Sequence, residues 1–224
     1  MAVDKPPGLL VHRTGLDAGE TQFALQLLRD QLGRPVWPAH RLDKGTSGVL
    51  LFALDADTAR ALSLAFEAPD AVHKTYLAVV RGWPPESGLI DHPLRRIEDD
   101  ARPGREEVQA AQTRYRTLEH YELPLPQGPF PTTRCARVEL RPLTGRRHQL
   151  RRHLKHIAHP IIGDATHGKG ALNRAIAGLL GAQRLWLHAA CLEVVHPVAR
   201  VSLRLEAPAG TDWDGWRRHE RIAV

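Results

Sequence analysis

Residues 40–54 read HRLDKGTSGVLLFAL, a polar, turn-forming segment that runs directly into six consecutive apolar residues. An apolar run as short as 49–54 is typical of a buried strand. In the polar part, Gly45 and Gly48 bracket a Thr-Ser pair, which is a composition typical of a turn. The segment therefore predicts a turn that leads straight into a buried strand.

Asp43 is the candidate catalytic residue of this turn. It stands between Arg41 and Lys44, whose positive charges favour the ionised form of its carboxylate. An ionised carboxylate suits a nucleophile or a general base better than a proton donor. The alternative is that Asp43 only caps the turn with its side chain, and the turn by itself does not decide between the two.

Outside this segment, helical and strand patterns are mixed without the regular alternation of a doubly wound sheet. This mixture predicts the α+β class, and because no composition shift marks a linker, we expect one domain over residues 1–224. Thr21 and Asp57 are expected to cap helices, Gly33 to end one, and residues 97–110 to form a polar loop. The expected strands are 2–11 (broken by Pro6-Pro7-Gly8), 49–54, 76–81, 111–119, 134–140, 185–195 and 200–205, and the expected helices are 22–32, one from Asp57 to Pro69, 146–158 and 171–180.

Positive charge is concentrated in residues 132–159. The whole chain has a net charge of +6, but this segment holds eight Lys and Arg residues against the single acid Glu139, so the remainder sums to −1. A concentrated positive patch on a near-neutral body is the pattern expected of a protein that binds a polyanion. The alternative is a solvated helix face without a function.

The expected helix 146–158 lies inside this basic segment. Leu150, Leu154 and Ile157 are spaced i, i+4, i+7, which predicts one face packed into the core. The start of such a helix, flanked by arginines, is a ready phosphate site, although it equally suits an arginine that pairs with a buried carboxylate. Histidines stand at positions 148, 153, 156 and 159, but no metal-binding motif accompanies them and the arginines would repel a dication, so no metal site is predicted.

Lys74-Thr75-Tyr76 is a third polar group, placed at the start of the expected strand 76–81. A tyrosine on a strand is more often a half-buried packing residue than a catalytic one. This group by itself therefore predicts packing.

Composition and missing motifs exclude several classes of protein. Apolar residues make up 42% and charged residues 25%, no apolar stretch is long enough to span a membrane, and residues 1–8 lack an apolar signal region. Cys135 and Cys191 have no CxxC spacing, which fits a reducing, cytoplasmic setting. No Walker A loop or GxSxG elbow is present, which argues against a nucleotide-triphosphatase and a serine hydrolase.

Taken together and in this order, the polar stretches resemble the RluA-type pseudouridine synthases. The resemblance implies a single catalytic domain with a mixed, mostly antiparallel sheet flanked by helices and loops around a basic cleft. It also implies an isomerase that detaches uracil from C1′, rotates it and rejoins it through C5, with no redox change and no cofactor. The matching segments are HRLDKGTSG at 40–48, KTY at 74–76, LTGRRHQLRRH at 143–153, HPIIGD at 159–164, DKPPGL at 4–9 and LHA at 187–189.

The resemblance also implies roles for individual residues. Asp43 matches the catalytic aspartate, which engages the sugar or the base either covalently or by removing a proton. Tyr76 matches the tyrosine that lies against the uracil ring, and Arg151 matches the arginine that pairs with the aspartate and keeps it ionised. Arg41 matches the arginine that fills the space left when the uridine flips out of the RNA helix. The residues expected to bind RNA are Arg41, Lys44, Arg146, Arg147, His148, Arg152 and Lys155.

Within the family, the likeness is closest to the TruC type, which modifies uridine 65 of certain transfer RNAs; LVHR at 10–13 and DATHG at 164–168 support it. We therefore expect a transfer RNA substrate, modified at a paired uridine of the acceptor and T-arm region, with no membrane and no obligate protein partner. A ribosomal RNA synthase of the same family and a non-catalytic RNA-binding homologue stay open as alternatives. We expect no appended S4-like domain, and because the sequence starts so close to DKPPGL, a truncated N-terminal edge strand or a mis-assigned start stays open.

Overall fold

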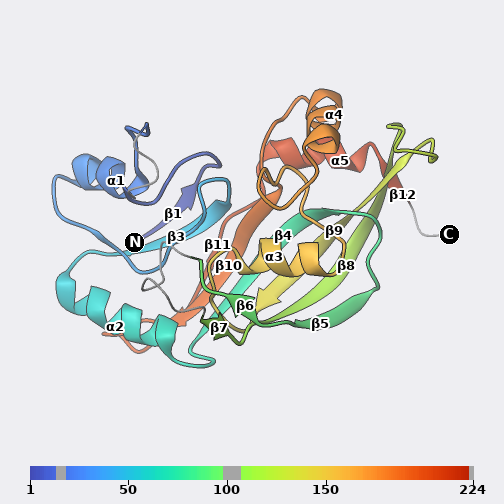
Figure 1. Cartoon of the computed structure of the whole chain (residues 1–224). Coiled ribbons are helices and arrows are strands. Elements are labelled where there is room, and N and C mark those ends of the chain that lie inside the picture. The colour runs from blue at the N-terminus through green and yellow to red at the C-terminus, as the bar shows by residue number, and fades with distance from the viewer. Residues whose placement is uncertain (14–18, 98–106, 222–224) are drawn as a thin grey trace. The chain divides into compact units, whose positions relative to one another are not determined.

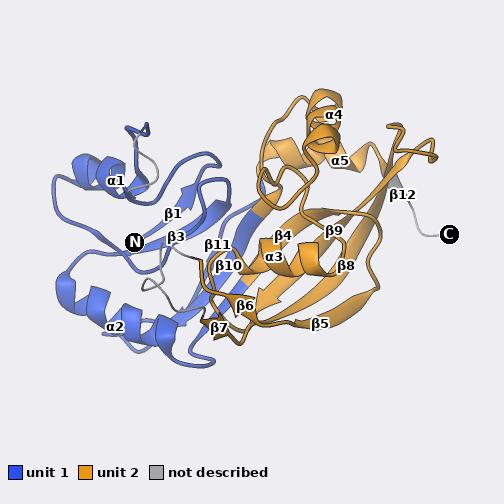
Figure 2. Cartoon of the chain, viewed as in Figure 1, with its two compact units in different colours: residues 1–74, 188–209 blue, residues 75–187, 210–224 orange. Residues whose placement is uncertain are grey.

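The structure is a computed structural model of the chain and describes residues 1–13, 19–97 and 107–221 (Figure 1). It divides into two compact units, which are coloured separately in Figure 2. Unit 1 consists of Met1–Lys74 and His188–Ala209, and unit 2 consists of Thr75–Leu187 and Gly210–Val224.

Two of the three points at which the chain changes unit lie inside strands. Strand β4 (Val72–Arg81) carries the chain out of unit 1 after Lys74, and β10 (Leu187–Val195) carries it back before His188. Because a strand rather than a linker makes each of these crossings, the composition of the sequence gives no sign of a boundary there.

Unit 1 is built on a sheet around β3 (Ser47–Ala53). Strand β1 (Ala2–Lys5) pairs antiparallel with β3, and β2 (Trp37–Pro38) pairs with the far end of β3. Strand β10 runs parallel to β3 at its first residues and then forms an antiparallel hairpin with β11 (Ser202–Glu206). Every residue of β3 is buried, which confirms the buried strand predicted from the apolar run at 49–54.

Helix α1 (Ala24–Leu32) confirms the helix predicted over 22–32, but Thr21 does not cap it. The first two N–H groups of the helix donate instead to the carbonyl oxygens of Leu10 and Val11, at 2.8 and 3.0 Å. Backbone acceptors from elsewhere in the unit thus take the place of a side-chain cap. The helix ends at Gly33 as predicted, in a left-handed conformation with φ 62°.

Helix α2 (Ala56–Glu67) is capped by Asp55, whereas the sequence predicted Asp57 as the cap. The Asp55 carboxylate accepts from the N–H of Thr58 at 2.7 Å, which is the geometry of an N-cap, while Asp57 falls in the first turn. The helix packs on the sheet of unit 1. The buried residues of this contact are Val49, Leu51, Ala53, Leu62, Leu192, Val194 and Ala207.

Unit 2 is built on an antiparallel sheet with β9 (Thr133–Pro142) at its centre. Strand β4 pairs with one edge of β9 and β8 (Gln112–Leu123) with the other. Strand β8 also pairs with β5 (Ser87–Asp91) and β12 (Glu220–Arg221). Mostly antiparallel strands combined with helices confirm the predicted α+β class.

Strands β6 (Leu94–Arg95) and β7 (Val108–Gln109) form a separate two-stranded sheet in unit 2. The loop predicted over 97–110 falls mainly on residues 98–106, outside the described residues. Its end is not a loop, since it forms β7.

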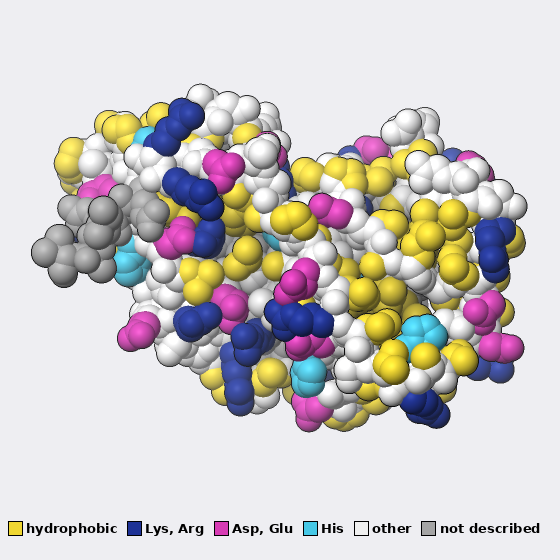
Figure 3. All heavy atoms as spheres, turned by 180° about the vertical axis from the view of Figure 1, so that it is seen from behind, with side chains coloured by type: hydrophobic (Ala, Val, Ile, Leu, Met, Phe, Trp, Pro, Cys, Tyr) yellow, Lys and Arg dark blue, Asp and Glu magenta, His cyan; other side chains and the backbone are white. Residues whose placement is uncertain are grey.

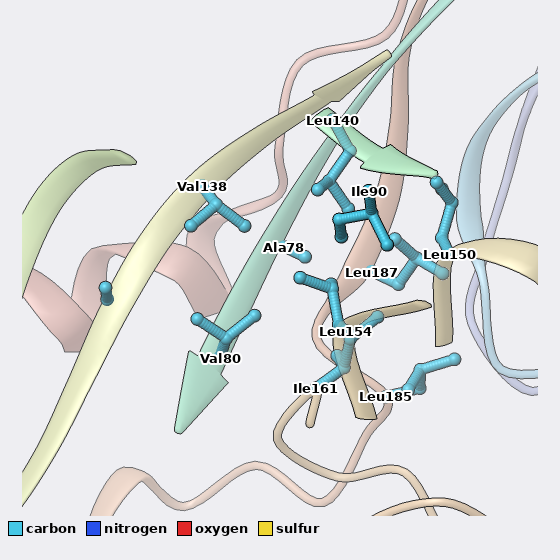
Figure 4. Packing of buried hydrophobic residues seen from close by; sticks show 11 residues of the cluster. Ala78, Val80, Ile90, Val138, Leu140, Leu150, Leu154, Ile161, Leu185 and Leu187 are labelled. Atoms are coloured by element: carbon cyan, nitrogen blue, oxygen red, sulfur yellow. The ribbon is translucent and has the colours of Figure 1, made fainter. Parts of the chain in front are cut away.

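Helix α3 (Gln149–His156) is shorter than the helix predicted over 146–158. His148 has a left-handed backbone with φ 54°, and Ala158 has φ 63°, so neither residue can continue an α-helix. The predicted core face is correct: Leu150 and Leu154 are buried, and Ile157 packs against the same cluster. Figure 4 shows Leu150 and Leu154 beside residues of the strands, and the full cluster is Ala78, Val80, Ile90, Ala136, Val138, Leu140, Leu150, Leu154, Ile161, Leu185 and Leu187.

The C-terminal part of unit 2 forms around tryptophans. Helix α4 (Gly170–Leu180) confirms the helix predicted over 171–180, whereas the single turns η2 (Thr211–Trp213) and α5 (Asp214–Arg217) were not predicted. The rings of Trp213 and Trp216 meet Trp186 edge to face, with centroids 5.4 and 5.3 Å apart. A single helical turn is not stable by itself in water, so these turns depend on this packing. One turn is also too short to show a periodicity in the sequence.

In the view of Figure 1, α3 lies in front of the sheet of unit 2. Figure 3, from the opposite side, shows Lys and Arg side chains interspersed with Asp and Glu, with no region of one sign. None of the helices in the described residues has the length and apolar composition needed to cross a membrane.

Candidate active site

The turn that carries Asp43 is fixed by backbone hydrogen bonds within unit 1. The N–H of Thr46 donates to the carbonyl oxygen of Asp43 at 3.0 Å and closes the turn. The carbonyl oxygen of Lys44 accepts from the N–H of Gly8 at 2.8 Å, which ties the turn to the N-terminal segment. Asp43 itself is half-buried. A carboxylate on a fixed turn keeps its orientation before a substrate arrives.

Lys5 supports the same turn and is only 1% exposed. Its Nζ donates to the carbonyl oxygens of Pro6, Leu9 and Lys44, at 2.9, 2.7 and 3.2 Å. These acceptors offset part of the cost of burying an ammonium group. The sequence matched Lys5 to a family segment but gave it no role, because its partners are backbone atoms that only the fold brings together.

A buried side-chain pair fixes the start of β3 to β10. Ser47 Oγ lies 2.9 Å from His188 Nδ1, and His188 Nε2 lies 2.9 Å from the carbonyl oxygen of Ala207. A carbonyl oxygen only accepts, so Nε2 carries the proton and the Ser47 hydroxyl donates to Nδ1. The pair therefore holds the strand that follows the Asp43 turn.

His40, the first residue of the motif at 40–48, has a structural role. Its Nε2 accepts from the N–H of Leu51 at 3.1 Å, and its ring stacks on Phe66 with centroids 4.9 Å apart. Burial, together with the charge of Lys74, lowers the pKa of His40 to about 3. An imidazole that stays neutral at physiological pH and accepts from the backbone is not a general acid.

The two basic residues beside Asp43 lie at the surface of unit 1. Arg41 is exposed, and Lys44 forms an ion pair with Glu20. The side chains of that pair are 45% and 37% exposed, and an exposed pair of this kind contributes about 0–1 kcal/mol. A phosphate group can compete with Glu20 for Lys44 at little cost.

Tyr76 lies on β4 in unit 2, opposite Leu140 of β9. It is half-buried and packs against the hydrophobic cluster of that unit. This is the packing role that its position on a strand predicted. A partly exposed phenol ring of this kind also leaves one part of its surface for a substrate.

Arg151, on α3, binds a partner that the sequence does not predict. Its Nε donates to Asp164 Oδ2 at 2.7 Å and its Nη2 to Asp164 Oδ1 at 2.9 Å. The two side chains are 10% and 0% exposed, so this is a buried, bidentate pair. It confirms the reading in which the basic segment presents an arginine to a buried carboxylate.

The Asp164 carboxylate also organises the segment that follows it. Oδ1 accepts from the N–H groups of Thr166 and His167, both at 2.9 Å. Burial acts to raise the pKa of Asp164, but the hydrogen bond from Arg151, those from the two N–H groups and the charge of Arg151 together lower it. Asp164 is therefore ionised and keeps Arg151 in one orientation.

The loop that leads into α3 is held by the buried side chain of Gln149. Its Oε1 accepts from the Thr144 hydroxyl at 2.7 Å and from the N–H of Arg146 at 3.0 Å. Its Nε2 donates to the carbonyl oxygen of Gln112 at 2.9 Å and to Thr113 Oγ1 at 3.0 Å. All four hydrogen-bond partners of the Gln149 amide belong to unit 2, and together they give the basic loop a fixed shape.

The residues of unit 2 predicted to bind RNA lie on this loop and on α3. Arg146 and Lys155 are exposed, and Arg147, His148 and Arg152 are half-buried. Within the parts of the chain that the structure describes, no group of three or more His, Cys, Asp or Glu side chains is arranged to hold a metal ion. Asp43 belongs to unit 1, whereas Tyr76 and Arg151 belong to unit 2.

The comparisons with known proteins define the class. The model of the RNA pseudouridylate synthase family matches residues 1–156. Solved structures agree: human RNA pseudouridylate synthase domain containing 1 aligns over 100% of this chain and 85% of its own, with a TM-score of 0.75 and 25% identity. Human RNA pseudouridylate synthase domain containing 4 aligns over 100% and 91%, with a TM-score of 0.70 and 27% identity. The chain belongs to the RNA pseudouridylate synthase family, which confirms the RluA-type resemblance.

Curated relatives narrow the likeness within that family. The chain is 47% identical to tRNA pseudouridine synthase C of Vibrio cholerae, over 96% of this chain and 89% of the relative. It is 48% identical to the protein of the same name from Yersinia pestis, over 96% and 85%. The similarity thus spans nearly the whole of both chains and includes both units.

Proposed function

We propose that this protein converts a uridine of transfer RNA to pseudouridine, at position 65 in the acceptor and T-arm region. The observation that supports this most is the similarity of 47–48% over nearly the whole chain to enzymes named tRNA pseudouridine synthase C. Membership of the pseudouridylate synthase family supports the chemistry, an isomerisation that needs no redox partner.

We propose that units 1 and 2 act together as one catalytic domain, with Asp43, Tyr76 and Arg151 as its catalytic residues. In this proposal, Asp43 attacks or deprotonates the nucleotide as the bond between N1 and C1′ breaks. Uracil rotates, C5 bonds to C1′ while any bond between Asp43 and C1′ breaks, the proton of C5 is lost with the help of Tyr76, and N1 takes up a proton. Arg151 keeps Asp43 ionised, and the buried Arg151–Asp164 pair, which holds Arg151 in one orientation, supports this role.

The target uridine must leave its stack before it can react. Unstacking a paired base costs a few kcal/mol, and in the proposed mechanism Arg41 fills the vacated space. The base edges of a double-stranded RNA are hidden in a deep, narrow groove, so recognition depends on shape and on the backbone. The remaining basic residues, Lys44, Arg146, Arg147, His148, Arg152 and Lys155, are proposed to hold the phosphates.

We further propose that the protein works in the cytoplasm and that it needs neither a cofactor nor a protein partner. The closed shape of the Asp43 turn and the buried Arg151–Asp164 pair support a site that is preformed by this chain alone.

The substrate is tested by offering the purified protein two pools of unmodified RNA separately, transfer RNA and naked ribosomal RNA. Pseudouridine is then mapped by carbodiimide-stop sequencing. We expect a stop at position 65 of transfer RNAs that carry a uridine there, and none in ribosomal RNA. Modification confined to ribosomal RNA would overturn the substrate and keep the chemistry. Binding without modification of either pool would favour the non-catalytic homologue.

A further inference from the structure

The turn that follows Asp164 places His167 beside α3. Asp164 Oδ1 accepts from the N–H of His167 at 2.9 Å, and the same carboxylate binds Arg151. The His167 ring meets the ring of His148 edge to face, with centroids 5.7 Å apart and an angle of 77° between the planes. His167 and Arg151 thus bind the same carboxylate, and the His167 ring contacts His148, the residue that precedes α3.

The Nε2 atom of His167 is enclosed, and it has no hydrogen-bond partner among the described residues. A buried polar atom left without a partner costs about 1–3 kcal/mol. Such atoms are rare in folded proteins, and each one calls for an explanation in terms of a ligand, a water or a functional role. A ligand that supplies a hydrogen-bond partner to Nε2 would recover this free energy.

The surroundings of His167 are strongly positive. Burial lowers its pKa first; Asp164 acts to raise it, and Arg151, Lys155 and Arg152 lower it further. Asp164 is already engaged by Arg151, and no ion pair involves Arg152 or Lys155 within residues 1–13, 19–97 and 107–221. The ligand that this environment favours is therefore an anion.

The positive groups also have a regular arrangement. His148, Arg152 and Lys155 are spaced i, i+4, i+7 at the start of α3 and along it, which places them on one face, while Leu150 and Leu154 pack into the core. Seven residues of helix span about 10 Å. Successive phosphates of a nucleic acid strand advance by about 3.4 Å along the helix axis, so the stripe is long enough to contact several of them.

We propose that His148, Arg152 and Lys155 form a phosphate-binding site for the RNA backbone, and that the His167 ring turns to bring its enclosed Nε2 to the phosphate and takes up a proton as it binds. This inference rests on the proposed function. The proton comes from solvent and forms an imidazolium that donates to a phosphate oxygen. A metal ion is disfavoured by the same positive charge, and an uncharged base would gain nothing from it.

The proposal predicts how affinity for RNA depends on pH. Free His167 has a lowered pKa, and an anion bound beside it raises that pKa, so binding strengthens as the pH falls towards the lowered value. The groups that face His167 are His148, Arg151, Arg152 and Lys155 from α3 and its cap, and Asp164 from its own turn. His148 is the other histidine among them.

The test measures binding of an unmodified transfer RNA transcript to Asp43→Asn protein, which is expected to bind without turnover. Further substitutions in that background are His167→Gln, Arg152→Ala and, as a matched control, the exposed His73→Gln. Dissociation constants are measured against salt concentration at about pH 6 and about pH 8. Proton uptake on binding is measured by calorimetry in buffers of different ionisation enthalpy, and melting temperatures confirm that each variant is folded.

We expect His167→Gln to weaken binding at the lower pH and to reduce the slope of log affinity against log salt there by about 0.7–0.9, with little effect at the higher pH. Arg152→Ala should reduce the slope at both pH values, and proton uptake should fall with His167→Gln alone. If His167→Gln matches His73→Gln at both pH values, the phosphate site is overturned while the proposed function stands. If the Asp43→Asn protein without further substitutions does not bind the transcript, both the phosphate site and the proposed function are overturned.

Discussion

At the scale of single residues, the candidate site depends on groups that hold the catalytic candidates in place. Asp164 holds Arg151 in a buried, bidentate pair, and Lys5 holds the turn of Asp43 through three carbonyl oxygens. The motifs predicted Asp43, Tyr76 and Arg151 as the catalytic residues from the sequence. They did not predict these supporting contacts, because Asp164 and Lys44 stand 13 and 39 positions away from their partners.

Asp164→Asn tests the importance of the buried pair. The change leaves Arg151 without its anionic partner, and we expect the free energy of unfolding at neutral pH to fall by about 3 kcal/mol. Because folding lowers the pKa of Asp164 below its ordinary value of 3.8, its stabilisation is present above that value and is lost as the pH falls through the lower, folded pKa.

Urea unfolding of both proteins from neutral pH down to about pH 3 checks this expectation. Wild-type protein should lose stability in the acid range, and Asp164→Asn should lack that part of the loss. The matched control is Asp30→Asn at an exposed pair with Arg29. Equal acid dependence in wild type and Asp164→Asn would show that the pair does not stabilise the fold.

At the scale of elements, the periodicity of apolar residues predicted which helices form but not where each helix begins and ends. It predicted α1, α2, α3 and α4 and the core face of α3. Both predicted caps were wrong, since α1 begins on backbone acceptors of Leu10 and Val11 and α2 begins two residues earlier than expected. Helix ends depend on contacts with other segments, which a local pattern does not contain.

The close approach of β3 and β10 is an element-scale feature with a direct test. Gly48 has φ 108°, and a Cβ added there would lie 2.2 Å from the carbonyl oxygen of Ala189. Gly33 also has positive φ, but an added Cβ would meet nothing within 4 Å. Gly48→Ala should therefore destabilise the protein by about 1–3 kcal/mol more than Gly33→Ala, because only Gly48→Ala adds an overpacking cost to the backbone strain.

Denaturant unfolding and isomerase activity of the two variants check the difference. Gly48→Ala displaces the strand that carries the Asp43 turn, so we expect its activity to fall below that of Gly33→Ala. Equal stability and equal activity would mean that β3 and β10 separate without cost, contrary to the tight parallel pairing of His188 with Ser47.

At the scale of the whole molecule, the sequence predicted the α+β class and the family, but not the division into two units. Both units contain residues from separate parts of the chain, and β4 and β10 pass from one to the other. Short elements such as β6, β7 and α5 were also missed, since two to four residues give no period to detect. The proposed function requires both units, because Asp43 lies in one and Tyr76 and Arg151 in the other.

The most direct test of the proposed function is to measure the release of tritium from C5 of labelled uridine in an unmodified transfer RNA transcript. Pseudouridine formation replaces the C5 hydrogen, so each turnover releases label. We predict stoichiometric release by the wild-type protein, none from a transcript in which uridine 65 is replaced by cytidine, and none with Asp43→Asn, which keeps the side-chain volume and removes the charge. Release by Asp43→Asn within about tenfold of the wild-type rate would contradict the assignment of Asp43 as the catalytic residue.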